Sequence, residues 1–249
     1  MELNGAKCLI TGGTRGIGAA TATALAERGA DVALAARRID DQAQTVKRQI
    51  ETTGRRCELI RADLGKSDDA RRSVEATVKA LGGIDVLVHS AGGPVPGGLF
   101  DVSPETWHAA FDVHVHAVFH LCRAAIPHMR RGKQGAIVLI SSTAGIRAVK
   151  TNVTYQAVKG AIPHLARALA YEFAGENIRV NCVAPGIIRT DFHAVMSEQQ
   201  KKHNLENRVP LHREGTPQQV ATVIREMITN DYVTGETYVI DGGLTMRIP

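Results

Sequence analysis

Several common signals are missing from this 249-residue sequence. No stretch approaches 18 uninterrupted apolar residues, and the N-terminus leads into an apolar run without a charged-then-apolar leader. Both absences argue against a membrane span and a secretory signal. The four cysteines form no Cys-x-x-Cys pair or Cys/His spacing, which favours buried free thiols in a reducing compartment. We therefore expect a soluble cytoplasmic protein that contacts no membrane and holds no metal.

Aromatic residues and blocks of like charge are also scarce. Aromatic residues make up 4% of the chain and hydrophobic residues 44%, which predicts a substantial core with aliphatic packing, as in a buried parallel sheet. The net charge of +5 is spread along the chain without a run of five like charges. This modest basicity fits an anionic small molecule better than nucleic acid, and we expect no nucleic-acid partner.

Short apolar runs alternate with longer helical patterns. Several runs are continuous stretches of Val, Ile, Leu and Ala, which is typical of strands buried on both faces. The expected strands are 7–11, 31–36, 56–62, 85–89, 136–141, 179–183 and 237–240. The expected helices are 16–28, 40–53, 66–81, 104–129, 154–175 and 217–229. Repeated strand–helix–strand units predict an α/β fold, a Rossmann-type doubly wound parallel sheet of about seven strands with helices on both faces.

No linker or internal repeat interrupts this alternation, so the simplest interpretation is a single domain over residues 1–249. Residues 187–215 break the pattern, because they are polar and His-rich with scattered apolar positions. A segment of this length without a strand is more often functional than a passive loop, and we expect a small helical substrate lid.

A glycine-rich segment, Thr11-Gly12-Gly13-Thr14-Arg15-Gly16-Ile17-Gly18, joins the first strand to the first helix. Glycine permits a tight turn and close approach to a phosphate, and the N–H groups at the start of a helix face the anion. The same pattern also occurs in strand–helix turns that bind nothing. Its position at the first junction of an alternating chain favours a dinucleotide site.

The end of the second strand discriminates between dinucleotides. A carboxylate there would bind the ribose hydroxyls and repel a 2′-phosphate. This chain has Arg37 and Arg38 instead, with Arg15 in the glycine segment. Guanidinium groups bind phosphate with paired hydrogen bonds and so favour NADP(H), although solvated surface charges would give the same sequence. Asp63, after the third strand, would accept a hydrogen bond from the adenine amino group or cap the following helix.

Ser142, Tyr155 and Lys159 form a second pattern about 140 residues after the first. Tyr155 and Lys159 are four residues apart and so share one face of a helix. A free tyrosine titrates near ~10, and a nearby ammonium with an oxidised nicotinamide would lower that pKa. Tyr155 could then protonate a carbonyl oxygen to which Ser142 also donates a hydrogen bond. Beside a dinucleotide, this set predicts a carbonyl/alcohol oxidoreductase.

In the order and spacing of these motifs, the chain resembles the short-chain dehydrogenase/reductase (SDR) family over essentially its whole length. The resemblance extends to the Pro185-Gly186 step followed by Thr190, and to segments 233–235 and 241–243. It implies hydride transfer between a nicotinamide and a carbonyl or secondary alcohol, with Lys159 also holding the nicotinamide ribose. It also implies homodimers or homotetramers built partly through the helices that carry Tyr155 and His114. Many similar chains act on 3-oxoacyl thioesters, which makes such a substrate the first expectation.

The expected site divides into two groups. The expected catalytic residues are Ser142, Tyr155, Lys159 and His114. The expected cofactor-binding residues are Gly12, Thr14, Arg15, Gly16, Ile17, Gly18, Arg37, Arg38, Asp63, Leu64, Ala91, Gly92, Tyr155, Lys159, Pro185, Gly186, Ile188 and Thr190.

Two departures from the family pattern are informative. His89-Ser90 stands where family members usually carry Asn-Asn, and His114 stands where the family has an asparagine that helps hold a proton-relaying water. His114 could act through its ring or its backbone carbonyl, or the relay could differ. His116 and His120 lie one helical turn apart, but without cysteine or acidic ligands nearby a packing or subunit-contact role is favoured over a metal site.

Alternative functions remain open at this point. One is an NAD-preferring dehydrogenase of sugars, polyols or alcohols, against which Arg37 argues. Another is a dinucleotide-binding regulatory protein whose chemistry has decayed. The substrate pocket is expected along 93–98, 143–147, Ile187 and the lid. Its expected apolar wall comprises Pro94, Val95, Pro96, Phe192, Val195 and Met196. Cations that would meet an anionic substrate, or be solvated, are Arg147, Lys150, Arg189 and His193.

Overall fold

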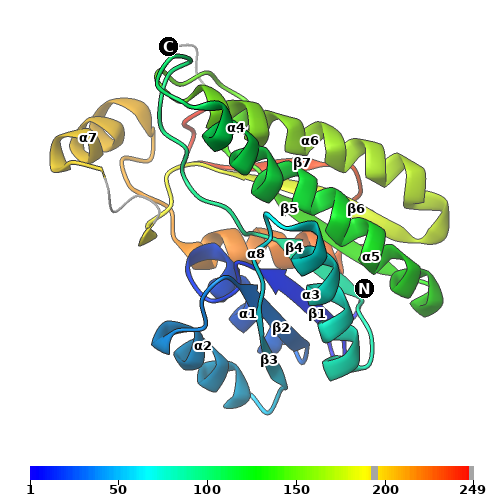
Figure 1. Cartoon of the computed structure of the whole chain (residues 1–249). Helices are drawn as coiled ribbons and strands as arrows, with labels where there is room; N and C mark the ends of the chain where they lie inside the picture. Colours follow the sequence, from blue (N-terminus) through cyan, green and yellow to red (C-terminus); the bar gives the residue numbers. More distant parts are fainter. Residues whose placement is uncertain (192–195, 247–249) are drawn as a thin grey trace.

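Seven apolar runs form one parallel sheet in the computed structural model, which describes residues 1–191 and 196–246 (Figure 1). The strands are β1 (Lys7–Thr11), β2 (Asp31–Ala36), β3 (Cys57–Arg61), β4 (Val86–His89), β5 (Gly135–Ile140), β6 (Ile178–Pro185) and β7 (Thr237–Ile240). Their spatial order is β3-β2-β1-β4-β5-β6-β7, and each neighbouring pair is parallel. The predicted α/β Rossmann-type fold is confirmed.

Helices cover both faces of the sheet (Figure 1). The helices are α1 (Gly16–Ala26), α2 (Asp41–Glu51), α3 (Ser67–Leu81), α4 (Pro104–Phe111), α5 (Ala117–Gly132), α6 (Val153–Phe173), α7 (Glu198–His203) and α8 (Pro217–Thr229), of which α7 stands apart from the sheet (Figure 1). Leu9 of β1 packs into the core formed with α3, α5 and α6, whereas Cys8 and Ile10 pack into the core formed with α1, α2 and α8. Successive strand residues point to opposite faces, so a strand covered on both sides must be apolar throughout.

The helix predicted over 104–129 is two helices joined by a π turn, Asp112–His116. Ser103 caps the first of them by accepting a hydrogen bond from the Thr106 N–H. The apolar periodicity continues from α4 into α5, so the pattern does not reveal the wider turn between them. Isolated π turns inside helices are frequent at functional sites, and this one contains His114.

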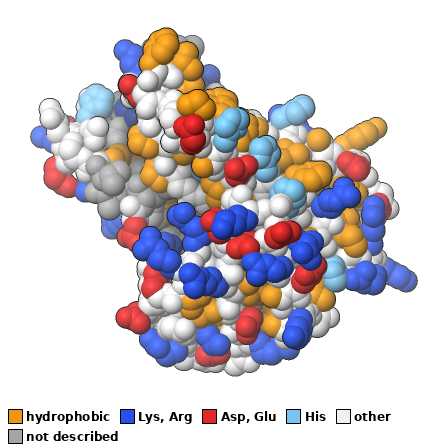
Figure 2. All heavy atoms as spheres, in the orientation of Figure 1, with side chains coloured by type: hydrophobic (Ala, Val, Ile, Leu, Met, Phe, Trp, Pro, Cys, Tyr) orange, Lys and Arg blue, Asp and Glu red, His pale blue; other side chains and the backbone are white. Residues whose placement is uncertain are grey.

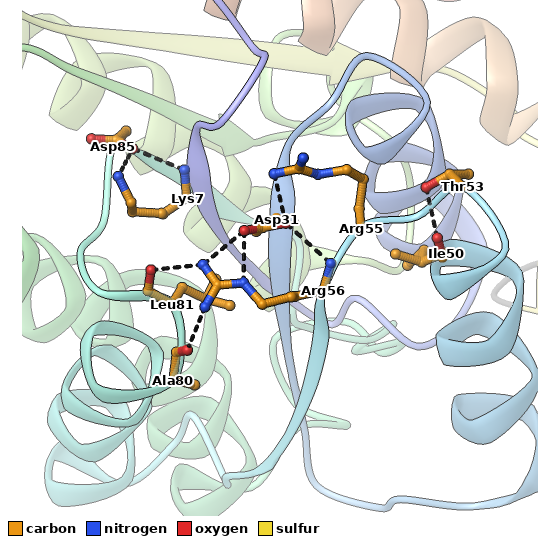
Figure 3. A network of polar contacts seen from close by, with 9 residues as sticks. All are labelled: Lys7, Asp31, Ile50, Thr53, Arg55, Arg56, Ala80, Leu81 and Asp85. Atoms are coloured by element: carbon orange, nitrogen blue, oxygen red, sulfur yellow. Dashed lines mark hydrogen bonds and ion pairs between the residues drawn. The ribbon is translucent and has the colours of Figure 1, made fainter.

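A charged network closes the sheet at the amino ends of its strands (Figure 3). Asp31, the first residue of β2, pairs with Arg55 and Arg56 at 2.8 Å each. Arg56 also donates hydrogen bonds to the last carbonyls of α3, and the Lys7 backbone N–H donates to Asp85 at 2.8 Å. Burial alone would raise the pKa of Asp31, but hydrogen bonds from Arg56 and the charge of Arg55 lower it.

Basic and acidic side chains are interspersed over the lower half of the molecule, where α2 and α3 lie (Figures 1 and 2). Mixed charge of this kind keeps the surface hydrated around the sheet without a single strong field on the face shown. The carboxyl edge of the sheet lies opposite the charged network at the amino ends of the strands. Loops from several strands converge at the carboxyl edge, and ligands bind there in open α/β sheets.

Candidate active site

A cleft of about 1430 Å³ opens at the carboxyl edge of the sheet. It is lined by residues that follow β1, β2, β3, β4, β5 and β6, together with α7 and the segment after it. Most predicted site residues border it: Gly12, Thr14, Arg15, Gly16, Ile17, Arg37, Asp63, Leu64, Ala91, Gly92, His114, Ser142, Tyr155, Lys159, Pro185, Gly186, Ile188 and Thr190. Of the predicted set, Gly18 and Arg38 do not line the cleft. The topology therefore brings together residues that are up to about 180 positions apart.

Gly18 acts from behind the cleft. A Cβ at this position would lie 2.2 Å from the Gly12 carbonyl oxygen, so only glycine lets the first turn of α1 pack against the strand–helix turn. Gly12 itself has φ +64, and a Cβ there would lie 2.9 Å from the backbone of Ala91. Gly12 thus brings the backbone after β1 against the backbone after β4, and Gly18 brings the first turn of α1 against Gly12.

The arginines at the end of β2 and in the glycine turn differ in their surroundings. Arg37 is exposed and lines the cleft, and Arg38 is exposed outside it. The Arg15 guanidinium donates to the Asp40 carboxylate at 2.6 Å, and Asp40 also caps α2 by accepting from the Ala43 N–H. Arg15 thus lines the cleft while it is paired with Asp40, and a phosphate bound there would share its guanidinium with this carboxylate.

Asp63 does not cap the following helix, which was one of its two predicted roles. Its Oδ1 accepts a hydrogen bond from the Gly65 N–H at 3.2 Å, and α3 has Lys66 at its N-cap position. The Asp63 N–H is in turn held by the Asp69 carboxylate at 2.8 Å. The side chain therefore shapes the turn after β3 at the wall of the cleft, where the adenine interaction stays a prediction.

Ser142, Tyr155 and Lys159 converge at the centre of the cleft. Ser142 follows β5, and Tyr155 and Lys159 lie in the first two turns of α6 with 8% and 7% of their surface exposed. The Lys159 ammonium donates to the Ile140 carbonyl at 2.8 Å and lies 5.8 Å from the centre of the Tyr155 ring. The arrangement places a phenol, a hydroxyl and an ammonium around one buried space.

Burial sets the protonation of this group in the protein alone. It raises the pKa of Tyr155 to about 12, against a smaller lowering by a hydrogen bond with Ser142. It lowers the pKa of Lys159 to about 8. Desolvation thus dominates, and Tyr155 is held as the phenol, the form that can donate a proton. The predicted lowering of the tyrosine pKa stays a prediction for the protein with its cofactor bound.

Ser141 is a supporting residue that sequence reasoning missed. Its hydroxyl donates to the backbone carbonyl of Lys159 at 2.7 Å and is buried. Gly145 permits the same contact between the segment after β5 and α6, because a Cβ there would lie 2.5 Å from the Lys159 carbonyl carbon. The position of Ser141, directly before Ser142 at the end of a buried strand, is the only sequence signal for this role.

His114 lies in the π turn and is 2% exposed. Its Nε2 lies 3.1 Å from the Gly93 carbonyl oxygen, and its ring stands edge-on to Tyr155 with ring centres 6.0 Å apart. The Gly93 N–H lies 3.4 Å from the same nitrogen, so Nε2 donates to the carbonyl in one neutral tautomer and accepts from the N–H in the other. Nδ1 is buried without a hydrogen-bond partner among the described residues. Burial and the Lys159 charge lower the pKa of His114 to about 2, so the ring is neutral and is not a titrating proton carrier.

The segment predicted as a lid forms α7 and a second π turn, Asn204–Arg208, beside the cleft. Between residues 196 and 208, the residues that line the cleft are Met196 and five polar residues, Gln199, Gln200, His203, Asn204 and Arg208. Of the apolar wall predicted for this segment, Phe192 and Val195 lie outside the described residues, as does His193. The polar lining by residues 196–208 was not predicted, because α7 has only 6 residues and no clear periodicity.

The cations predicted to meet an anionic substrate have separate environments. Lys150 lines the cleft. Arg189 pairs with Glu214 at 3.1 Å, and Arg147 donates to the Thr245 carbonyl at 3.3 Å. Arg208, which sequence reasoning missed, lines the cleft and donates to Asn204 at 2.8 Å.

Comparison with known proteins agrees with this geometry. The family described as enoyl-(acyl carrier protein) reductase matches residues 12–245. The chain belongs to the short-chain dehydrogenase/reductase family. A glucose 1-dehydrogenase of Gluconobacter oxydans is 35% identical over 97% of this SDR chain and 92% of its own. A 3-oxoacyl-[acyl-carrier-protein] reductase, FabG, of Thermotoga maritima is 35% identical over 99% of this chain and 100% of its own. The crystal structure of a short chain dehydrogenase from Burkholderia cenocepacia J2315 in complex with NADP superposes with a TM-score of 0.92, at 33% identity over 98% of this chain and 99% of that one.

As an SDR, the protein is a dehydrogenase/reductase that acts on CH–OH groups of small molecules and uses a nicotinamide cofactor. Within residues 1–191 and 196–246, no group of three or more His, Cys, Asp and Glu side chains is arranged to hold a metal ion. His116 instead pairs with Asp112 at 2.8 Å. In the same part of the chain, no helix combines the length and apolarity needed to cross a bilayer.

Proposed function

We propose that the protein is an NADP(H)-dependent carbonyl reductase in which Tyr155 delivers the proton to the carbonyl oxygen. The observation that carries the proposal is the buried Ser142–Tyr155–Lys159 group in one cleft with the glycine turn. This group borders a single space, as a proton donor and a hydride source must. NADPH bound along the cleft would supply the hydride.

The chain's own residues would perform the remaining steps. Ser142 and Tyr155 would both donate hydrogen bonds to the carbonyl oxygen, which polarises the carbonyl and orients it. The phenol, held protonated by burial, would release its proton as negative charge develops on that oxygen. Lys159, fixed by the Ile140 carbonyl, would stabilise the resulting phenolate and bind the nicotinamide ribose.

The glycine turn would hold the pyrophosphate, because its backbone approaches the start of α1 with no side chain between. Arg37 and Arg15 border the adenosine end and support binding of a 2′-phosphate. The NADP bound to the Burkholderia cenocepacia relative supports the same choice of cofactor. The test is the ratio of kcat/KM with NADPH to that with NADH in wild type and in Arg37→Ala. The ratio should fall by about tenfold or more, the effect of losing one charge-assisted phosphate contact. Arg38→Ala, outside the cleft, is the matched control, and an unchanged ratio in Arg37→Ala would reject the assignment.

We propose a 3-oxoacyl thioester as the substrate class, supported by the 3-oxoacyl-[acyl-carrier-protein] reductases among the similar proteins. A panel of 3-oxoacyl thioesters, 2-enoyl thioesters, glucose and cyclic ketones with NADPH and NADH tests it. Oxidation of glucose with NAD would instead favour a sugar dehydrogenase, the activity for which the Gluconobacter relative is named. The absence of turnover in every assay would favour a regulatory dinucleotide-binding protein, and turnover that is lost in Tyr155→Phe would exclude it.

We further propose one domain with residues 187–215 as its lid, acting in the cytoplasm as a homodimer or homotetramer. Phe119 on α5 and Tyr171 on α6 are 56% and 92% exposed, and such surface apolar residues support subunit contacts. Sedimentation velocity of wild type and Tyr171→Glu tests the assembly. A wild type that sediments as a monomer at micromolar concentration would overturn it.

A further inference from the structure

A chain of hydrogen bonds behind the cleft links the ends of two strands to the π turn. The Ala91 N–H lies 3.3 Å from the Thr11 hydroxyl oxygen, and that oxygen lies 2.9 Å from Nδ1 of His89. On the other side of the ring, Nε2 of His89 lies 3.1 Å from the Val113 carbonyl oxygen. Thr11 and His89 are register partners at the ends of β1 and β4.

The two ends of this chain fix the direction of every bond in it. A backbone N–H only donates, so the Thr11 oxygen accepts from Ala91 and its own proton is free to point at His89. A carbonyl only accepts, so Nε2 of His89 carries the ring proton and donates it to Val113. Nδ1 is then the acceptor for Thr11. Each donor meets an acceptor only if His89 is neutral, with its proton on Nε2.

The carbonyl that His89 contacts belongs to Val113, the residue before His114. Val113 and His114 are consecutive within the π turn, and the His114 ring lies over Gly92, where a Cβ would fall 2.1 Å from its Cε1. His114 also contacts the Gly93 carbonyl. Ala91, at the opposite end of the hydrogen-bond chain, precedes these two glycines. One buried imidazole thus ties together both segments that form this wall of the cleft.

We propose that His89 is a positioning residue that locks the π turn to the ends of β1 and β4, and so fixes the His114 ring and the Ala91–Gly93 backbone at the nicotinamide end of the cleft. His89 is 3% exposed and is not among the cleft-lining residues, so it acts through its neighbours and not on the substrate. A wider π turn leaves carbonyls without the partners of a regular helix, which gives the imidazole a backbone acceptor at this point.

Burial keeps the imidazole in the required state. Desolvation, with the nearby Lys159 charge, lowers the pKa of His89 to about 4, against a smaller opposite effect of the bond to Val113. The ring therefore stays neutral throughout the physiological range. The neutral His89 ring can therefore accept from Thr11 and donate to Val113 at the same time.

The experiment compares His89→Phe, which keeps a ring of similar size without hydrogen bonds, with His89→Gln, whose amide can still donate toward Val113. Assays run well below the Tm of each variant. We expect His89→Phe to lower kcat by about tenfold or more with KM for NADPH changed by less than about threefold, because misplaced groups affect the reacting geometry more than cofactor contacts. His89→Gln should recover kcat to within about threefold of wild type. His108→Gln, at an exposed histidine on α4, is the matched control and should leave both constants unchanged.

A second measurement does not depend on activity. Histidine ¹⁵N NMR should show His89 neutral and protonated on Nε2 from pH 5 to 8. A ring that titrates near 6.5 or carries its proton on Nδ1 would overturn the proposal. So would a folded His89→Phe with wild-type kcat, or a His89→Gln no better than His89→Phe. The role of His89 rests on the proposed function only for the kcat measurement, which needs an active reductase; the NMR measurement does not. If wild type reduces no carbonyl compound, the proposed function fails while the tautomer still decides the role of His89.

Discussion

Gly18→Ala tests how the glycine turn works, because Gly18 does not touch the cleft. The added Cβ would lie 2.2 Å from the Gly12 carbonyl oxygen and 2.8 Å from its carbonyl carbon. Ordinary contacts between such atoms are above 3.4 Å, and both partners are backbone, so no side chain can rotate away. The start of α1 must therefore move away from the turn by about 1 Å, the size of the overlap.

Two separate losses are expected from this displacement. Overpacking at a rigid contact costs about 1–3 kcal/mol, which lowers the Tm by roughly 2–10 °C in a chain of this size. Displaced N–H groups at the start of α1 also lose a charge-assisted hydrogen bond to phosphate, worth about 1.5–3 kcal/mol, so NADPH should bind about 10–100-fold more weakly.

The assay is a titration of NADPH by fluorescence at 10 °C, where the variant remains folded, together with thermal unfolding. Gly175→Ala is the matched control, because nothing lies within 4 Å of its added Cβ and its φ is ordinary. It should bind NADPH like wild type. If Gly18→Ala bound NADPH within about twofold of wild type, with a Tm within about 1 °C, the contact between Gly18 and Gly12 would not position the start of α1 for the cofactor.

Three further outcomes are expected from burial and charge. Asp31→Asn should cost about 2 kcal/mol and about 4–8 °C in Tm at pH 7, because two arginines lose their carboxylate. Since folding lowers the pKa of Asp31, that stabilisation is present above the unfolded value of 3.8 and is lost as pH falls through the folded one, so the two Tm curves should meet in acid. In a plot of kcat/KM for reduction against pH, the value should fall as pH rises through about 8, because Lys159 loses its proton. A buried neutral His114 should cause no change in kcat/KM between pH 5 and 8, and a change there that disappears in His114→Ala would contradict its neutral state. Burial raises the pKa of all four cysteine thiols, so a thiol reagent should modify them in denaturant and leave them largely unmodified in the native protein; rapid labelling of any one of them before unfolding would show that it is accessible.

The sheet could be predicted from sequence because its strands are buried on both faces. β1, β2 and β7 begin and end at the predicted residues, and the other strands differ from prediction by one or two residues at an end. Continuous Val, Ile, Leu and Ala leave little alternative to a buried strand when glycine turns and amphipathic helices flank them. The convergence of Ser142, Tyr155 and Lys159 followed from the same topology, because all three lie in the connection from β5 to β6, which begins at the carboxyl edge of the sheet.

What sequence reasoning missed depends on contacts between distant residues. The π turn has the composition and periodicity of the helices around it, and its position is visible only when His89 meets Val113. In the sequence, His89 is only a departure from a pattern, with no partner to explain it. The proximity of Lys159 in the sequence predicts a lowered pKa for Tyr155, whereas the dominant effect is desolvation by surrounding elements.

The charged network at the amino ends of the strands has a practical consequence for engineering. Asp31 and its arginines lie at one edge of the sheet, and the cleft lies at the other. Libraries of variants in the cleft loops, made to select for new substrates, would leave this charged network intact. Substitutions that strengthen the network would leave the cleft unchanged. Distant sites without shared partners usually contribute additively to stability. A more stable parent made at the amino edge should therefore tolerate more of the costly substitutions that a new activity requires at the carboxyl edge.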